Sequence, residues 1–184
     1  MKWRNDARSW GLPSILLHWG MALLATLLFV LGKYMMTLDY YHPLYQRIPD
    51  LHRNLGVLFA LLLCLRLLWR WSNPLPAMHA VPRERVLALL MHRMFYVVMF
   101  AIVISGYLIS TADGHDLLLY GGVELPALVS GVDNLEDRAG RVHWFLTWLL
   151  TAMLVLHAGA ALKHHFVDGD ATLIRMLGIQ SRGE

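Results

Sequence analysis

Apolar residues along the chain gather into four long runs that polar connections separate. The runs cover about residues 15–36, 52–71, 92–110 and 143–162. A stretch of about 18 or more apolar residues with few charges is typical of a helix that crosses a membrane. The pattern therefore predicts an all-α fold, a four-helix transmembrane bundle that forms a single domain over residues 1–184.

The composition is typical of a membrane protein. Hydrophobic residues make up 57% of the chain and charged residues only 16%, whereas a soluble domain carries about a quarter charged residues. Cys64 is the only cysteine, which excludes both an internal disulfide and a C-x-x-C-H site for covalent haem attachment. The net charge of +3 does not point to a nucleic acid partner, because the basic residues flank the apolar runs.

The charges of the connections predict which side of the membrane each faces. Basic residues lie before the first run and around the second connection: Lys2, Arg4, Arg8, Arg66, Arg70, Arg83, Arg85 and Arg93. The third connection, residues 111–142, is acidic overall. By the positive-inside rule, both termini and the second connection face the cytoplasm. Glycines and a proline divide the third connection into short apolar pieces, so we expect a structured loop over the outer face of the bundle.

Four histidines lie within or at the edges of the apolar runs: His18, His52, His143 and His157. An imidazole in hydrocarbon is costly unless something binds it. His143 and His157 are fourteen residues apart, which places them on one helix face at depths about 21 Å apart. The topology then pairs His52 with His143 near the outer face and His18 with His157 near the inner face. Facing imidazoles from two helices are typical axial ligands of a haem iron, and zinc is disfavoured because each depth lacks a carboxylate or thiolate.

The same fourteen-residue step relates other residues on these helices. It leads from His18 to Gly32, from His52 to Arg66 and from His92 to Gly106. Glycine at the outer depth lets a flat macrocycle approach the backbone, so we expect Gly32 and Gly106 to pack against haem. Arg66 either holds a haem propionate through charge-assisted bonds or extends to the cytoplasmic interface.

The remaining histidines leave several roles open. His92 begins the third run on the cytoplasmic side and is an interfacial residue, a quinone contact or a propionate partner. His164 and His165 follow the fourth run and either anchor the helix as a basic flank or bind a quinone head group. His164 is the first to test, because it lies seven residues, two turns, from His157. His42, His79 and His115 lie in connections, and no role is assigned to them.

The four runs resemble the bacterial cytochrome b561 family, whose members are four-helix inner-membrane proteins with two b haems. The matching stretches are "SILLHWGMALL", "LHRNLGVLFALLLCLRLLWR", "HRMFYVVMFAIVISGYLISTADG" and "VHWFLTWLLTAMLVLHAGAALKHHF". The resemblance covers roughly residues 14–176 and is carried by the spacing of the histidines. It implies that His18, His52, His143 and His157 are the axial ligands of two haem b groups.

The resemblance also implies an oxidoreductase that relays electrons across the bilayer to ubiquinone or another quinone. A characterised relative of this kind oxidises superoxide on the periplasmic side. The acidic third connection of this chain would repel that anion unless Arg53, Arg138 or Arg141 gathers near the outer haem. Two other functions stay open: the cytochrome b membrane subunit of a hydrogenase or dehydrogenase complex, with a redox partner protein, and a haem-free membrane protein for transport or packing.

Overall fold

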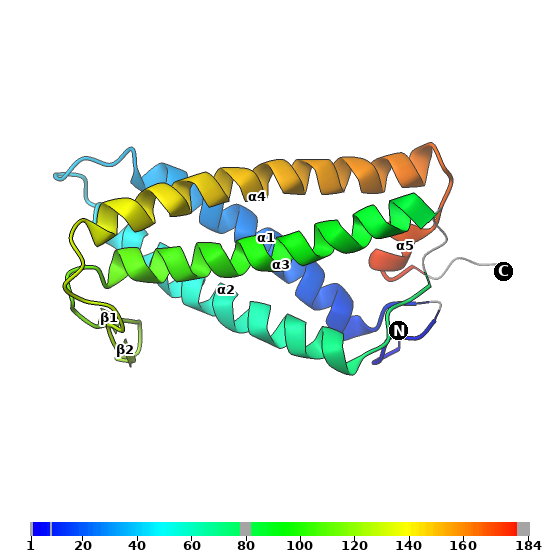
Figure 1. Ribbon diagram of the computed structural model, residues 1–184, viewed down its shortest axis with the longest axis horizontal. Coiled ribbons are helices and arrows are strands. Elements are labelled where there is room, and N and C mark those ends of the chain that lie inside the picture. The colour runs from blue at the N-terminus through cyan, green and yellow to red at the C-terminus, as the bar shows by residue number, and fades with distance from the viewer. Residues whose placement is uncertain (1, 8, 78–81, 180–184) are drawn as a thin grey trace.

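The computed structural model describes residues 2–7, 9–77 and 82–179. Arg8, one of the predicted N-terminal cations, and His79 lie outside the described residues. The described elements follow in chain order (Figure 1): α1 (Leu12–Met35), α2 (Arg47–Ser72), α3 (Pro82–Ser110), β1 (Leu117–Leu118), β2 (Glu124–Leu125), α4 (Leu135–Phe166) and α5 (Thr172–Met176).

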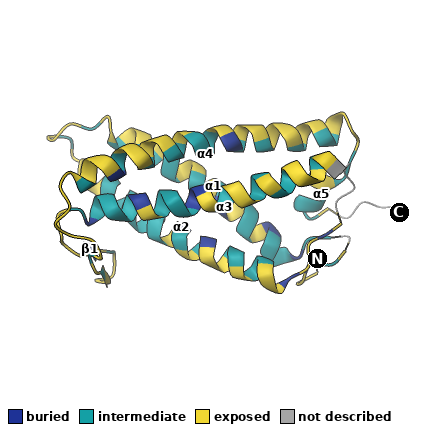
Figure 2. Cartoon of the chain, viewed as in Figure 1, coloured by how far each residue is buried: buried dark blue, intermediate teal, exposed yellow. Residues whose placement is uncertain are grey.

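The four long helices form an elongated bundle (Figure 1). α1 packs mainly on α2 and α3 mainly on α4, and α2 also contacts α3. All four are long and apolar enough to cross a membrane, which confirms the predicted helical architecture. Many residues of these helices are exposed (Figure 2). Large apolar residues such as Leu23 and Val155 are among them. Apolar exposure on this scale is expected for a surface that contacts lipid.

Two helices extend well beyond the apolar runs that predicted them. α3 begins at Pro82, ten residues before the predicted span, and α4 begins at Leu135, eight residues before its span. The added turns are richer in charged residues, as in "PRERVLALLM" and "LEDRAGRV". Hydropathy detects only the part of a helix that suits hydrocarbon, whereas backbone hydrogen bonding continues into the interface. His92 therefore lies ten residues inside α3 and not at the start of a helix.

The buried core lies near the middle of the bundle. Met21 of α1, Phe59 and Leu63 of α2 and Met99 of α3 form one buried cluster, against which Leu150 of α4 packs. Leu150 is seven residues from both His143 and His157. The apolar core therefore separates two levels of the bundle, one toward each end.

One end of the bundle carries a short β-hairpin between α3 and α4, and we call it the hairpin end (Figure 1). β1 and β2 pair antiparallel, with Leu117 opposite Leu125. The backbone N–H of Tyr120 donates to the side-chain oxygen of Asn54 at 2.7 Å, which attaches the hairpin to α2. Gly121 and Gly122 have φ values of 87° and 78° in the turn, a backbone region that favours glycine.

The opposite end, which we call the terminal end, holds the start of α1 and the short helix α5 (Figure 1). Asn5 is buried there, and its side-chain oxygen accepts hydrogen bonds from the Gly11 backbone and the Ser14 hydroxyl at 2.8 and 2.7 Å. The indole N–H of Trp19 donates to the Met176 carbonyl at 2.9 Å. These bonds attach the segments before α1 and after α4 to the bundle.

Candidate functional site

Two pairs of histidines lie between the α1–α2 helix pair and the α3–α4 helix pair. His52 of α2 and His143 of α4 have ring centroids 6.3 Å apart near the hairpin end. His18 of α1 and His157 of α4 also have ring centroids 6.3 Å apart, near the terminal end. The structure therefore brings together the same two pairs that the sequence predicted. Each histidine pair joins α4 to α1 or α2. A group held by either pair would therefore link the α1–α2 helices to the α3–α4 helices.

The spacing of the rings suits one metal ion between the two members of each pair. A metal–nitrogen bond of about 2 Å on either side places two imidazole rings about 6 Å apart. Among the described residues, neither pair belongs to a group of three or more His, Cys, Asp or Glu side chains at ligand distance. Two imidazoles without a third protein ligand suit an iron whose other ligands would come from a macrocycle, and they do not complete a tetrahedral zinc site.

The position of His143 is fixed by α3. Its Nδ1 lies 3.0 Å from the Ile102 carbonyl and 3.1 Å from the Ser105 hydroxyl oxygen. A Cβ on Gly106 would lie only 3.1 Å from Cε1 of His143, so glycine permits this close approach. An Nδ1–H that donates to the carbonyl leaves the lone pair on Nε2 free, which is the tautomer that a metal-binding histidine needs.

His52 has a corresponding environment on α1. A Cβ on Gly32 would lie 3.3 Å from Cε1 of His52. The Leu28 carbonyl, four residues before Gly32, faces this ring as the Ile102 carbonyl faces His143. Nδ1 of His52 is nevertheless buried without a partner at hydrogen-bond geometry among the described residues. Gly32 therefore makes room for the His52 ring, as Gly106 does for the His143 ring, and the packing of haem against these two glycines stays a prediction.

The pair at the terminal end is surrounded by cationic and aromatic side chains. Nη2 of Arg66 lies 3.0 Å from Nδ1 of His18, and because a guanidinium can only donate, His18 accepts this bond. The His92 ring lies 5.6 Å from the His157 ring, and the Phe95 ring lies 5.4 Å from it. Arg66 therefore points at the histidine pair from within the bundle, where a positive charge calls for an anion.

His92, whose role stayed open in the sequence, lies beside the pair at the terminal end. Its Nδ1 lies 2.6 Å from the Ala88 carbonyl, and its ring faces His157. The fourteen-residue step from His92 to Gly106 already placed both on one face of α3, and this was the signal for its position. Ser105 and the Ile102 carbonyl carried no such signal, because backbone carbonyls and serines occur throughout membrane helices.

Comparison with known proteins assigns this arrangement to a family. The family model for prokaryotic cytochrome b561 matches residues 9–178 of the chain. The chain belongs to the prokaryotic cytochrome b561 family. It is 40% identical over 183 residues to cytochrome b561 homolog 2 of Escherichia coli (strain K12), across 98% of this chain and 97% of that protein.

Two further relatives are more distant. Cytochrome b561 homolog 1 of Escherichia coli (strain K12) is 29% identical over 179 residues, which cover 89% of this chain and 93% of that protein. A protein of Yersinia pestis named probable superoxide oxidase CybB is 28% identical over 129 residues, which cover 69% of this chain and 73% of that protein.

Membership in the cytochrome b561 family confirms the predicted class of protein. The chain is a multi-pass membrane cytochrome of the bacterial inner membrane. The family also implies that it binds haem b, which argues against the haem-free alternative.

A cavity of about 380 Å³ lies at the hairpin end of this cytochrome, between the start of α2 and the hairpin. Asp50, Arg53, Asp113, His115 and Asp116 line it together with hairpin residues. Arg53 forms an ion pair with Asp50, and the backbone N–H and ring of His115 hold the pKa of Asp113 below its usual value. Of the three arginines considered for an anionic donor, only Arg53 lines this cavity; Arg138 and Arg141 are exposed on α4.

His164, the candidate quinone contact, lies in the last turn of α4 and away from the histidine pairs. Its Nδ1 lies 2.7 Å from a carboxylate oxygen of Asp168. Lys163 also contacts Asp168, at 2.8 Å, and the pKa of Asp168 is held below its usual value mainly by Lys163 and then by His164. His165 lies against Phe166, with ring centroids 4.6 Å apart.

Proposed function

We propose that the chain carries two haem b groups, one held by His52 and His143 and the other by His18 and His157. It would pass single electrons between a donor at the hairpin end and a quinone at the terminal end. The observation that supports this is the equal 6.3 Å spacing of the two histidine pairs. Both pairs use one face of α4, fourteen residues apart, which is about 21 Å along the helix axis.

The protein's part is to orient ligands, exclude water and balance charge. Haem supplies reversible one-electron chemistry when it is bound. Ser105 and the Ile102 carbonyl hold the ring of His143 and raise its basicity as a ligand. The central cluster around Leu63 keeps the space between the two levels apolar. No general base or nucleophile is needed for this function.

Arg66 is the proposed partner of a haem propionate. If His18 binds iron through Nε2, its Nδ1 carries a proton and no longer accepts from the guanidinium. Arg66 then needs another acceptor within reach of the histidine pair. A carboxylate is the strongest acceptor for guanidinium, through two parallel hydrogen bonds.

The distribution of charge supports an orientation of the chain in the membrane. Among the described residues, the basic ones at the terminal end include Lys2, Arg4, Arg70, Arg83 and Arg85. The hairpin end carries the acidic connection. We place the terminal end in the cytoplasm and the hairpin end in the periplasm by the positive-inside rule, so the donor is periplasmic. Superoxide is the first donor to test, because a relative is named a probable superoxide oxidase.

The decisive experiment measures haem per polypeptide in variants of each pair. We expect two haems per chain in the unaltered protein, one in His52→Ala and one in His18→Ala. His42→Ala is the matched control, because His42 lies in the connection between α1 and α2, and it should keep two. Pyridine haemochrome absorbance with protein quantification gives the ratio. Two haems in either variant, or one in the unaltered protein, would contradict the proposed pairing.

A further inference from the structure

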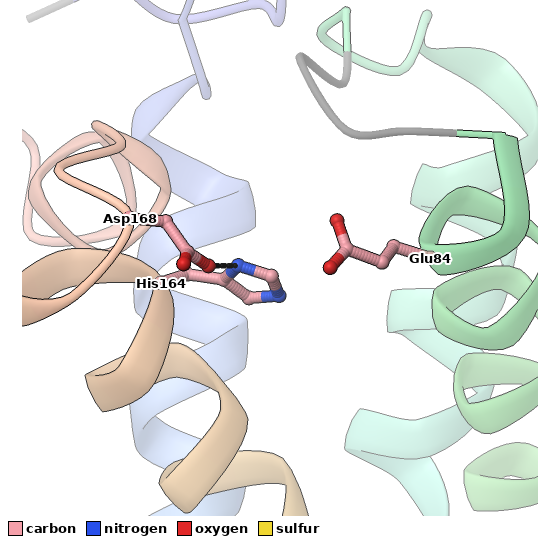
Figure 3. Close-up of side chains that lie close together, drawn as sticks. All are labelled: Glu84, His164 and Asp168. Carbon is pink, nitrogen blue, oxygen red and sulfur yellow. Dashed lines mark hydrogen bonds and ion pairs between the residues drawn. The ribbon is translucent and has the colours of Figure 1, made fainter.

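We propose that Glu84, His164 and Asp168 form a binding site for a divalent transition-metal ion of the zinc type. Their ligand atoms all lie within 4.8 Å of one another, and Figure 3 shows the three side chains gathered between α3 and the end of α4. The site is separate from the histidine pairs and does not depend on the proposed electron relay.

The backbone places the three groups from two directions. Glu84 lies in the first turn of α3, and His164 lies in the last turn of α4. Asp168 follows α4, where its backbone N–H bonds to the Lys163 carbonyl at 3.3 Å and the Asp170 N–H bonds to the His164 carbonyl at 3.0 Å. His164 and Asp168 are thus held as a pair by the turn that ends α4, and Glu84 faces them across a gap (Figure 3). A bound ion would connect α3 to α4 at the terminal end.

The chemistry of the three ligands selects the ion. One imidazole nitrogen with two carboxylates is a mixed set that suits zinc and similar late transition metals, with water as the fourth ligand. Magnesium and calcium prefer oxygen ligands alone. Tetrahedral bonds of about 2 Å place ligand atoms about 3.3 Å apart, so the widest separation, up to 4.8 Å, must shorten by up to about 1.5 Å. His164 and Asp168 are already 2.7 Å apart, joined by a hydrogen bond whose proton the metal would replace, and Glu84 makes the remaining movement.

The ammonium group of Lys163 already binds two carboxylates of the cluster. Its Nζ lies 2.8 Å from Asp168 and 3.8 Å from Glu84. The ammonium therefore competes with a metal for the same carboxylates, but its side chain is 51% exposed and can turn into water when the ion binds. Removal of Lys163 should consequently strengthen metal binding. If these residues only formed ion pairs with Lys163, the same substitution would lower the stability of the protein and would not raise its affinity for zinc.

The test is calorimetric titration of ZnCl₂ into the purified, haem-loaded full chain in detergent. We expect one site per chain whose affinity falls at least tenfold in His164→Gln and falls also in Glu84→Gln. Lys163→Gln should raise the affinity severalfold. His165→Gln is the control, because the neighbouring histidine is outside the cluster, and it should bind zinc like the unaltered chain. The haem spectrum of each variant verifies that it is folded.

Four outcomes would overturn the proposal, and the first three concern the unaltered chain, His164→Gln and Lys163→Gln. They are the absence of zinc binding to the unaltered chain, equal affinity of His164→Gln and the unaltered chain, and weaker binding by Lys163→Gln. A loss of affinity in His165→Gln as large as in His164→Gln would likewise assign the zinc to another place.

Discussion

At the scale of single residues, Arg66 raises the sharpest electrostatic question. Its guanidinium lies within the bundle, where the structure gives it the His18 ring at 3.0 Å and Tyr96 as neighbours. A neutral imidazole and a neutral phenol carry no negative charge that would balance the guanidinium. A cation at membrane depth is expensive without a counter-charge, so the residue makes most sense beside a cofactor that carries carboxylates.

Arg66→Gln should lower the reduction potential of the haem at the terminal end. A positive charge favours the reduced iron, and a unit charge within about 10 Å contributes about 1–2 kcal/mol at an effective dielectric constant near 20, or some tens of millivolts. Redox potentiometry of the two haem bands measures the change. Arg93→Gln, an exposed arginine of α3, should leave both potentials in place. Equal potentials in Arg66→Gln and the unaltered chain would exclude the propionate role.

At the scale of helices, glycines decide how near a histidine ring can come to a neighbouring backbone. Gly32→Val should displace His52, because a Cβ there would already lie 3.3 Å from the ring and overpacking costs roughly 1–3 kcal/mol. We expect the haem content to fall from two per chain toward one. Gly20→Val is the control on the same helix, since a Cβ at Gly20 meets nothing within 4 Å. If both valine variants keep two haems, Gly32 does not govern the His52 position.

Periodicity predicted the parts of this site that repeat. Fourteen residues return a helix to nearly the same direction, so the sequence alone placed His143 and His157 on one face and matched each to its partner. Arg66 was found in the same way, although two destinations for it stayed open. These predictions depended only on helix geometry and on the cost of polar groups in hydrocarbon.

The parts that do not repeat were outside the reach of the sequence. The charged first turns of α3 belong to the helix through backbone hydrogen bonds that hydropathy does not detect, so His92 was placed at a helix start. The bond of His143 to the Ile102 carbonyl depends on the rotation of α3 against α4. The contact of Asn54 with the hairpin joins residues 66 positions apart. The last two contacts arise from how elements pack, and no local pattern encodes them.

At the scale of the whole molecule, the two ends of the bundle differ in charge. The cavity at the hairpin end is lined by three aspartates, one arginine and one histidine. The aspartate carboxylates are close to the N-terminal part of α2, where His52 lies. The low pKa of Asp113 keeps its charge in place throughout the neutral range and down to mildly acidic pH. An anionic donor that approaches His52 therefore meets a field of its own sign.

If superoxide is the donor, its reaction with this chain should become faster as salt is added. Salt screens repulsion between like charges, and the screening length falls from about 30 Å at 0.01 M to about 10 Å at 0.1 M ionic strength. Asp113→Asn should raise the rate at low salt and flatten the salt dependence, because it removes one negative charge beside the cavity. Asp170→Asn, at the other end of the bundle, should change neither. Stopped-flow absorbance of haem reduction by superoxide gives the rates. A rate that falls with salt would mean instead that superoxide enters by a cationic path away from this cavity.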